Sequence, residues 1–597
     1  MTPVILAPAV RDVLSPTGER RPSIQWLVLS ALIGLVLADF AVPMRPGLSL
    51  FLLVPMSMLS VPWALRILGG GGEPARAGIE VWAVRLGIVA LAGIVLIAKW
   101  WLALEAVAGA PEHFVGSSRS YAVALGLLFV LGPLGSGRLW LRFLGLVSEH
   151  PARLIVLSFG LTGVLGGLAL SLPVSLQRVS ELSMLDNLFM AFSAVCVTGL
   201  SVNNLASTYT WFGQGVLCVL VQVGGLGIMV LSAAVALLMG QRMRVKSHAV
   251  FAEMVDAESL SQLRQVIAGV VIATFSIEGL IGLVLYHRFS LVELPFNPAI
   301  PANPAAARVW AAVFHAVSGF CNAGFSCFEV GLAPFVGDPT IMLGVTTLIV
   351  LGGVGFPVLQ ELAMRFGRRL LGRRRERLSL HARVSLGWTA ALLAGMTAAY
   401  LVLEWRVAFE GLAWHEKLLA ALFQSASCRT AGFNVIDVGA MQPASLMLTC
   451  VAMFVGGCPG SCAGGIKTTT VAVLFAGLRS ELRGRPAYLL DRALPLATTR
   501  KAVGVAFASF GLLSVFIFLL LLVERHAPLS IAFEAFSGFS TTGLSTGITP
   551  ALSSAGKLLV LTTMYVGRIG PLTLALAVSG RVEEARVQLP SERVLIG

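Results

Sequence analysis

The sequence predicts an all-α polytopic membrane protein in which four tandem helix–pore-loop–helix repeats surround one pore in a pseudo-four-fold arrangement. Its composition, its long uncharged runs and its internal repetition predict this fold. Of the 597 residues, 56% are hydrophobic and only 12% are charged, and the mean hydropathy is +0.86. A soluble protein of this size usually carries about a quarter charged residues. The composition therefore favours an apolar environment over water.

Long apolar runs without a charge occur at residues 212–240, 341–360, 384–402 and 503–523. Runs of ~20 residues match the ~30 Å hydrocarbon core of a bilayer at ~1.5 Å per helical residue. About four further spans precede the repeats, at residues 24–42, 48–65, 86–104 and 121–134. The first of these is too long for the core of a cleaved signal peptide. We therefore expect a cytoplasmic N-terminus and a region of N-terminal transmembrane helices over residues 1–150.

The net charge of +13 comes from basic residues that gather in short segments between the apolar runs. Examples are Arg242, Arg244 and Lys246, the arginines of residues 365–383, and the segment from Arg479 to Lys501. This distribution is the positive-inside pattern of cytoplasmic loops. A nucleic-acid partner would require basic residues on one folded face, so none is expected. The eight cysteines fall mostly in apolar or glycine-rich stretches and predict neither a disulfide framework nor a metal site.

Four short segments resemble one another: "SAVCVTGLS" (193–201), "SGFCNAGFS" (318–326), "SASCRTAGF" (425–433) and "SGFSTTGLS" (537–545). A second element recurs in step with them and reads "VGGLGI", "LGGVGF", "VGGCPG" and "VGRIGP". Two elements that keep register four times indicate four copies of one unit. The repeats are predicted at residues 151–248, 249–378, 379–495 and 496–580, followed by a cytoplasmic tail at 581–597.

Each unit is expected to hold a first span, a short helix, a polar loop and a second span that contains the glycine element. The short helices are predicted at residues 185–195, 310–320, 418–427 and 531–539. Non-helical backbone at membrane depth is tolerated only where it lines a water-filled path or is buried in protein. The loops are therefore expected to dip into the membrane from outside and to line a pore.

The loops carry one glycine each near their ends, at Gly199, Gly324, Gly432 and Gly543. Glycine has no Cβ, so the backbone can adopt positive φ and turn its carbonyls towards a pore. Rings of carbonyls replace the hydration shell of a monovalent cation. The alternative, that the glycines only permit close helix packing, explains the inner-span element but not four polar loops. His315, Gln424 and Glu534 precede the loops at similar offsets and are expected to brace them.

Lys467 and Arg568 are the sole charged side chains of residues 447–478 and 558–579. A charge at mid-membrane depth costs about 2.5–3.5 kcal/mol on insertion scales, which makes it a functional candidate. A cation below the loops would raise the barrier to a permeating cation, as a gate does. For Lys467, extension of the side chain to the cytoplasmic interface is the alternative.

The chain resembles the Trk/Ktr/HKT superfamily of potassium transporters, and most closely its Trk-type membrane (ion-conducting) subunit. The matching segments are "AVCVTGL", "FHAVSGFCNAGFS", "FQSASCRTAGF", "MFVGGCPGSCAGGIK" and "YVGRIGPLTL", within residues 150–580. The chain departs from that family upstream, where it has four apolar spans against the usual two. Glycine in all four loops goes with K⁺ selectivity in the family, whereas its sodium-favouring plant members carry serine in the first.

The resemblance implies a K⁺ selectivity filter whose backbone carbonyls bind the ion. Its residues would be Val197, Thr198, Gly199, Asn322, Ala323, Gly324, Thr430, Ala431, Gly432, Thr541, Thr542 and Gly543. It also implies an intramembrane loop that obstructs the pore in the third repeat. The gate residues would be Gly456, Gly457, Gly460, Gly464, Gly465, Lys467 and Arg568.

As partners, the resemblance implies a second copy of the chain in a homodimer and a cytosolic ring of nucleotide-binding (RCK-type) regulatory subunits. The basic loops, notably residues 365–383, are candidate docking surfaces for that ring. A nucleotide is then expected only on the partner, with no cofactor in this chain. The expected location is the inner (plasma) membrane of a bacterial cell.

Other functions fit parts of the sequence. Na⁺- or H⁺-coupled K⁺ symport and Na⁺ permeation both remain open. A nucleotide-hydrolysing membrane enzyme is the remote alternative, because "FVGGCPGSCAGGIKTTT" (454–470) resembles the phosphate-binding pattern G-x-x-x-x-G-K-[ST]. Gly460 and Gly465 have that spacing, but Ile466 intervenes before Lys467. We therefore expect a transporter and not an enzyme.

Overall fold

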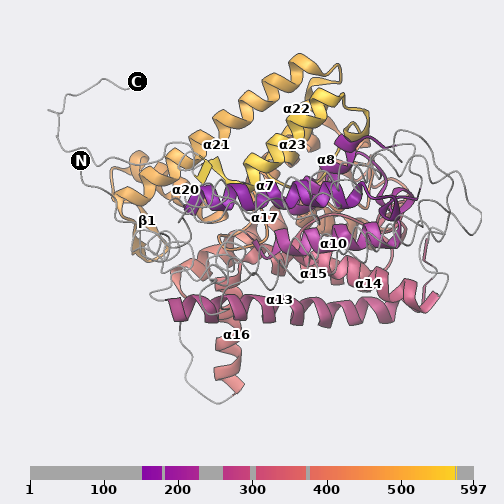
Figure 1. Cartoon of the computed structure of the whole chain (residues 1–597). Helices are drawn as coiled ribbons and strands as arrows, with labels where there is room; N and C mark the ends of the chain where they lie inside the picture. Colours follow the sequence, from indigo (N-terminus) through magenta and orange to yellow (C-terminus); the bar gives the residue numbers. More distant parts are fainter. Residues whose placement is uncertain are drawn as a thin grey trace, which may run out of the picture. The chain divides into compact units, whose positions relative to one another are not determined.

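The computed structural model describes residues 151–177, 182–227, 260–292, 294–295, 304–370, 377–571 and 573–574. The predicted N-terminal helices (1–150), the basic residues Arg242, Arg244 and Lys246, and the predicted tail (581–597) lie outside the described residues. The described part is mostly helical, and Figure 1 shows its long helices running in similar directions.

Four long helices begin the four predicted units: α7 (Pro151–Leu170), α13 (Leu260–Phe289), α17 (Leu380–Glu404) and α21 (Leu496–Val523). Within the described residues, three stretches are long and apolar enough to cross a bilayer unbroken: Ile267–Phe289, Leu380–Glu404 and Leu496–Val523. Their outward side chains are strongly exposed, at 69% for Leu280, 79% for Val402 and 82% for Phe507. Such surfaces are unfavourable in water but match hydrocarbon, so the chain is a multi-pass membrane protein.

The short helices lie where the sequence predicts them: α8 (Met184–Val195), α14 (Pro304–Cys321), α18 (Trp414–Ser427) and α22 (Pro528–Phe539). Local sequence explains how two of them begin. Ser183 and Asp186 form a capping box at the start of α8, and Pro528 occupies the first turn of α22, where its missing N–H is not needed. Each helix ends where a predicted polar loop begins, which confirms this part of the unit.

The inner helices are α10 (Trp211–Gly225), α15 (Pro339–Val354), α19 (Pro443–Phe454) and α23 (Ser554–Ile569). In the described residues, the helix of each second span is interrupted within or beside its glycine element. Gly355 (φ 97°) and Gly570 (φ 85°) directly follow α15 and α23, and Gly227 (φ 83°) lies two residues after the end of α10. This backbone conformation is available to glycine and ends helical hydrogen bonding. At Gly355 the chain turns by 106° into α16 (Phe356–Leu370).

The inner-helix glycines also allow close packing, as the alternative explanation of this element predicted. A Cβ on Gly224 would lie 2.0 Å from the Val195 carbonyl oxygen, at the end of the first short helix. In the same way, a Cβ on Gly352 would lie 1.9 Å from the Phe320 carbonyl oxygen, and one on Gly567 would lie 1.9 Å from the Phe539 carbonyl oxygen. The short helix of these three units therefore ends directly against its own inner helix, in a contact that only glycine permits.

The remaining elements connect the helices within and between the units. They are η2 (Pro173–Ser175), α9 (Leu205–Thr208), η3 (Ala333–Phe335), η4 (Val438–Ala440), α20 (Thr468–Arg483), β1 (Tyr488–Leu489), β2 (Arg492–Ala493) and η5 (Thr549–Ala551). The two strands form an antiparallel hairpin in the basic segment before α21. Asp491 in its turn accepts a hydrogen bond from Arg383 at 2.8 Å, so the hairpin is tied to the start of α17.

Each inner helix packs on the short helix of the next unit. Helix α10 packs on α14, α15 on α18, α19 on α22, and α23 on α8, which returns to the first unit. An ion pair of 2.7 Å between Lys557 on α23 and Asp186 on α8 joins the last unit to the first. The packing order of the described helices is therefore cyclic.

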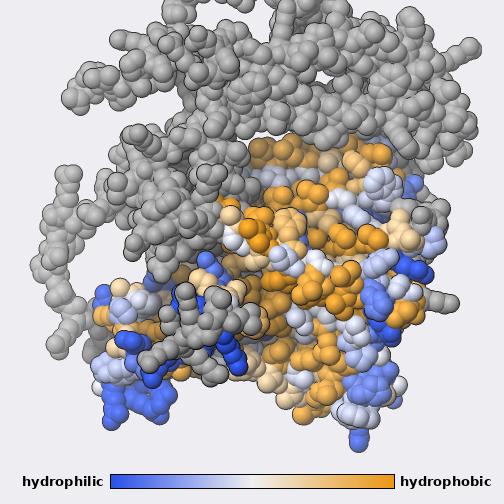
Figure 2. All heavy atoms as spheres, turned by 90° about the horizontal axis from the view of Figure 1, so that it is seen from below, coloured by the Kyte–Doolittle hydropathy of each residue, from blue (hydrophilic) through white to orange (hydrophobic). Residues whose placement is uncertain are grey.

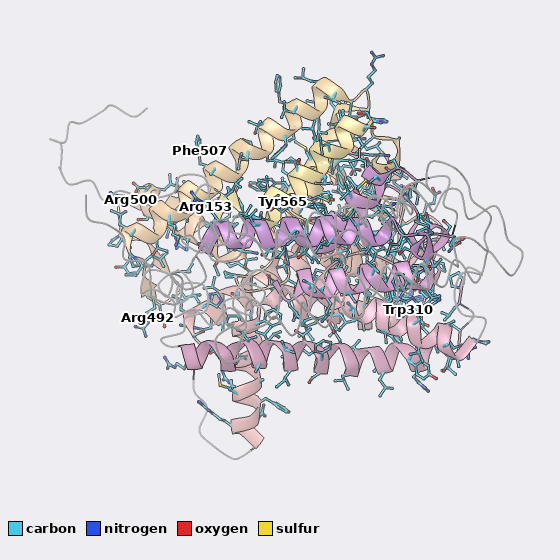
Figure 3. The ribbon with its side chains drawn as sticks, viewed as in Figure 1. Arg153, Trp310, Arg492, Arg500, Phe507 and Tyr565 are labelled. Carbon is cyan, nitrogen blue, oxygen red and sulfur yellow. The ribbon has the colours of Figure 1, made fainter. Side chains whose placement is uncertain are left out.

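The surface polarity agrees with a membrane environment. Figure 2 shows apolar residues across the middle of the described surface, with hydrophilic residues gathered towards its sides. Figure 3 places Arg153, Arg492 and Arg500 towards one end of the helices and Trp310 towards the other. Arginines gather at cytoplasmic ends of spans, which is consistent with short helices that enter from the outer side.

Candidate functional site

The four polar loops adopt one backbone conformation. In each loop a non-glycine residue with positive φ stands two positions before a glycine with positive φ. The pairs are Val197 (55°) and Gly199 (93°), Asn322 (62°) and Gly324 (69°), Thr430 (73°) and Gly432 (78°), and Thr541 (50°) and Gly543 (93°). Positive φ is a strained conformation for a β-branched residue such as Val197. Its recurrence in every loop indicates that the surrounding structure imposes it.

The loop glycines meet one another in the same cyclic order as the helices. A Cβ on Gly199 would lie 2.3 Å from the Ala323 carbonyl oxygen, and one on Gly324 would lie 2.6 Å from that of Ala431. The corresponding distances are 2.4 Å from Gly432 to the Thr542 oxygen and 2.1 Å from Gly543 to the Thr198 oxygen. The structure thus brings the four loops together in one ring, in which each loop glycine lies against the next loop and leaves no room for a side chain.

A serine at the end of each short helix holds its loop. The Ser193 and Ser537 hydroxyls accept hydrogen bonds from the Gly199 and Gly543 N–H groups at 3.1 and 3.0 Å. Ser318 donates to the Phe325 carbonyl at 2.8 Å, and Ser427 donates to the Phe433 carbonyl. The aligned first serine of the third copy, Ser425, instead bonds to Leu393 on α17. In the third copy Ser427, two residues further along the chain, holds the loop instead.

Several hydroxyl groups in the ring of four polar loops are buried and have no hydrogen-bond partner within the described residues. They belong to Thr198, Thr430, Ser540, Thr541 and Thr542. Hydroxyl and carbonyl oxygens are ligands that suit a monovalent cation stripped of water. An unmatched buried hydroxyl costs roughly 1–3 kcal/mol, so this concentration of oxygens fits the passage of a cation.

Polar residues of two short helices brace the segment that follows each loop. His315 Nε2 lies 2.9 Å from the Ser326 hydroxyl, two residues after Gly324. Glu534 accepts from the hydroxyls of Ser545, two residues after Gly543, and Thr549. The expectation that these residues brace the loops is confirmed for both. The amide of Gln424 has no such partner in the part of the chain that the structure describes.

The third unit contains a loop between α19, which ends at Phe454, and α20, which begins at Thr468. Val455 and Ile466, at its two ends, form an isolated parallel β-bridge. Gly460 (φ 72°) and Gly465 (φ 66°) supply its tight turns. Gly456 contacts the Gly464 carbonyl, where a Cβ would come within 1.9 Å of the oxygen. The glycines predicted as gate residues therefore fold one compact loop.

This loop fills the space between the units. Its Cys458 and Cys462 N–H groups donate to the Gly353 and Gly352 carbonyls of the second unit, at 2.9 and 3.2 Å. A Cβ on Gly457 would lie 2.9 Å from that same Gly353 oxygen. One on Gly464 would lie 2.1 Å from the Thr541 hydroxyl oxygen of the fourth polar loop. The 455–467 loop thus contacts both the ring of four polar loops and α15, the second inner helix.

The two predicted cations both bind this loop. Arg568 is 9% exposed and donates from Nη1 to the Cys462 carbonyl and from Nη2 to the Gly224 carbonyl. It therefore joins the loop to the first and fourth units. Lys467 donates from Nζ to the Ala463 carbonyl at 2.6 Å, within the loop itself. Its ammonium group therefore turns back on the loop and does not extend away from it.

Sequence reasoning missed a third intramembrane cation, Arg429, in the third polar loop. Its side chain is 7% exposed, and Nη2 lies 3.5 Å from the Thr389 hydroxyl on α17. Thr389 also contacts the Cys458 thiol of the 455–467 loop at 3.6 Å. The signal was the same one that singled out Lys467 and Arg568, a lone charge in an otherwise apolar segment.

Comparison with known proteins finds relatives over most of the chain. Residues 163–588 match the family model TrkH, described as a cation transport protein. The chain is 33% identical over 463 residues to "Ktr system potassium uptake protein B" of Bacillus subtilis, covering 77% of this chain and 98% of that one. It is 32% identical to "Potassium/sodium uptake protein NtpJ" of Enterococcus hirae, covering 75% and 97%.

A solved structure, the potassium transporter TrkH from Vibrio parahaemolyticus, has the same fold. Its TM-score is 0.56 at 18% sequence identity, and the match covers 83% of this chain and 98% of that one.

Proposed function

The chain belongs to the Trk/Ktr/HKT family of cation transport proteins, as a membrane subunit, and we propose that it takes up K⁺ through a selective, gated pore. The observation that carries this proposal is the closed ring of four loops that share one pattern of positive φ angles. Family members are transporters and not enzymes. The glycine-rich loop follows helix α19 and not a strand, which weighs against a phosphate-binding loop.

The filter proposal assigns ion binding to the backbone of the four loops. Dehydration of K⁺ is offset when carbonyl oxygens replace its water ligands. The positive φ angles of the loops redirect successive carbonyls, as a filter needs, and crowding at Gly199, Gly324, Gly432 and Gly543 keeps side chains out. The short helices end at the loops and would lend partial negative charge to a cation beneath them.

The gate proposal assigns closure to the 455–467 loop and Arg568. The loop lies in contact with the fourth polar loop, and Arg568 ties it to the first inner helix. A buried guanidinium beside the pathway repels K⁺ electrostatically. The small residues of the loop would let it withdraw when the Arg568 bonds break, which would open the pathway.

The architecture proposal follows from the cyclic packing. Four pseudo-symmetric repeats at 151–248, 249–378, 379–495 and 496–580 would enclose the pore, after N-terminal helices in 1–150 and before a tail at 581–597. The arginines at one end of the helices favour that end as cytoplasmic. The bacterial relatives favour a bacterial inner membrane, with a cytoplasmic N-terminus.

The partner proposal is a homodimer with a cytosolic nucleotide-binding (RCK-type) ring. Relatives named as part of a "Ktr system" support a further component. Arg365, Arg368 and Arg369 on α16 belong to the basic segment expected to receive it. The 106° turn at Gly355 joins α16 to α15, the helix that binds the 455–467 loop. Movement of α16 by a bound partner would therefore displace the gate loop.

Growth rescue tests the function directly. A bacterium that lacks its own potassium uptake systems is supplied with the chain and grown at low external K⁺. The account expects growth with the wild type, since an inward-negative potential supplies ~2.3 kcal/mol per charge per 100 mV. Failure to restore growth or ⁸⁶Rb⁺ uptake, with the protein present in the membrane, would overturn the proposal.

A further inference from the structure

A carboxyl group lies at the centre of an apolar span. Glu278 stands midway along the stretch Ile267–Phe289 of α13, and its side chain is only 5% exposed. It lies on the inward face of α13 with Val270, Thr274, Leu285 and Phe289, which are all buried. A charged group at this depth costs several kcal/mol unless it is compensated. Neither the filter nor the gate accounts for it.

The partners of Glu278 carry no positive charge. The Gln222 amide on α10 donates to Oε2 at 3.2 Å, and the Cys321 thiol on α14 lies 3.9 Å from Oε1. Cys321 also lies 3.7 Å from the amide oxygen of Gln222. The titratable groups facing Glu278 within the described residues are the thiols of Cys218 and Cys321. The third packed helix, α15, has no titratable side chain.

A second oxygen on the same face also lacks a partner. The Thr274 hydroxyl stands one helical turn before Glu278, is 1% exposed and has no hydrogen bond within the described residues. Residues i and i+4 of a helix lie one above the other. A carboxylate, a hydroxyl and an amide thus lie on α13 and α10, beside α14, which packs on both of these helices.

The site adjoins the gate. Gln222 lies two residues before Gly224, whose carbonyl accepts from Arg568. The Cys321 thiol would contact a Cβ on Gly225 at 2.3 Å, and the Gly225 carbonyl accepts from Cys462 of the 455–467 loop at 2.8 Å. Cys321 is also the last residue of α14, directly before Asn322 of the second polar loop. A change at Glu278 therefore reaches the filter and the gate through single side chains.

From this geometry we propose that Glu278 binds a second monovalent cation, H⁺ or Na⁺, distinct from the transported K⁺, and that its binding opens the gate. A single positive charge neutralises the carboxylate, whereas a divalent ion would leave net charge in hydrocarbon. Neutralisation weakens the hold of Glu278 on Gln222 and Cys321, which loosens the segment that anchors Arg568. This inference rests on the proposed function, K⁺ uptake, and identifies the ion that would be coupled to uptake or would activate it.

The test uses full-length protein in liposomes, with K⁺ uptake measured under a fixed membrane potential. One series varies pH without Na⁺, and another varies Na⁺ at fixed pH, so the two ions are distinguished. The wild-type rate should rise about fivefold with one ion, at the low end of usual coupling between sites. Glu278→Gln should show the high rate throughout and depend on neither ion. Glu278→Asp keeps a carboxylate and should retain the dependence.

Glu404→Gln is the matched control. Glu404 is another fully buried glutamate of a long helix, where it accepts backbone hydrogen bonds from Ala408 and Gln442. This variant should keep the wild-type dependence on H⁺ or Na⁺. As a readout independent of transport, the ion should raise the thermal unfolding temperature of the wild type in detergent, but not that of Glu278→Gln.

Two results would overturn the inference: a wild-type rate that depends on neither ion, or a Glu278→Gln protein that keeps the wild-type dependence. Failure of the proposed function is a different result, namely no K⁺ uptake by the wild type under any condition.

Discussion

Removal of the Arg568 side chain tests the gate most sharply. Arg568 donates two hydrogen bonds, to the Cys462 and Gly224 carbonyls, that join the 455–467 loop to the first inner helix. Hydrogen bonds from a charged group contribute about 1.5–3 kcal/mol each. At the lower value, Arg568→Met removes ~3 kcal/mol from the closed state, and each 1.4 kcal/mol is a factor of ten. The ratio of open to closed protein should therefore rise roughly 100-fold.

Arg568→Lys separates hydrogen bonding from charge. It keeps the positive charge but loses the planar fork of donors that reaches two carbonyls at once. The ratio of open to closed protein should therefore rise only about tenfold. The assay is single-channel recording of purified protein in planar bilayers, without a regulatory subunit, scored as open probability. Arg500→Met is the control, because Arg500 is exposed at the start of α21. An Arg568→Met protein with the open probability of the wild type would refute the gate assignment.

Two further predictions concern the packing of the units. Gly224→Ala puts a Cβ 2.0 Å from the Val195 carbonyl oxygen and should lower the free energy of unfolding by about 3 kcal/mol or more. By contrast, no atom lies within 4 Å of the Cβ position of Gly279, so Gly279→Ala should stabilise helix α13 by about 0.5–1 kcal/mol. Equal thermal unfolding temperatures of the two variants in detergent would contradict the packing. Lys557→Met removes the partner of Asp186, 2.7 Å away, and should destabilise by about 1–3 kcal/mol. Addition of Asp186→Asn should recover part of that loss, and an unchanged unfolding temperature in Lys557→Met would show that the ion pair contributes nothing.

The short helices could be predicted closely from sequence. Each is an apolar stretch that ends at a polar loop with a glycine, and these signals are local. The predicted end at Val195 agrees with α8, and the predicted end at Phe539 agrees with α22. Local signals suffice here because the residues that end the helix are adjacent to it in the chain.

The helix breaks at the glycine elements could not be predicted in the same way. Apolar residues continue through Gly355 into α16, so the run of hydrophobicity does not show the 106° turn. The turn depends on contacts with a distant segment, since the Phe356 N–H donates to the Gly460 carbonyl at 3.0 Å. Such contacts between units are set by tertiary packing, which a pattern within one unit does not contain.

The same limit applies to individual site residues. A lone charge in an apolar run identified Lys467 and Arg568 as important, but not which carbonyls they bind. Sequence alignment of the four copies also does not show that Ser427, and not the aligned Ser425, holds the third loop. Glu278 carries the same signal, as the sole acidic or basic residue between Arg264 and His287, but its partners on α10 and α14 are known only from the packing of these helices.

The most direct test of the central claim is the reversal potential of the wild type and Gly199→Ser under opposed K⁺ and Na⁺ gradients. Gly199 has a φ of 93°, and its Cβ position is 2.3 Å from the Ala323 oxygen, so a serine must displace the ring of loops. Gly411→Ser is the control, since Gly411 also has positive φ (81°) but no atom within 4 Å of its Cβ position. The account predicts a potential near that of K⁺ for the wild type and Gly411→Ser, and a shift towards that of Na⁺ for Gly199→Ser. An unshifted potential in a conducting Gly199→Ser protein would contradict it.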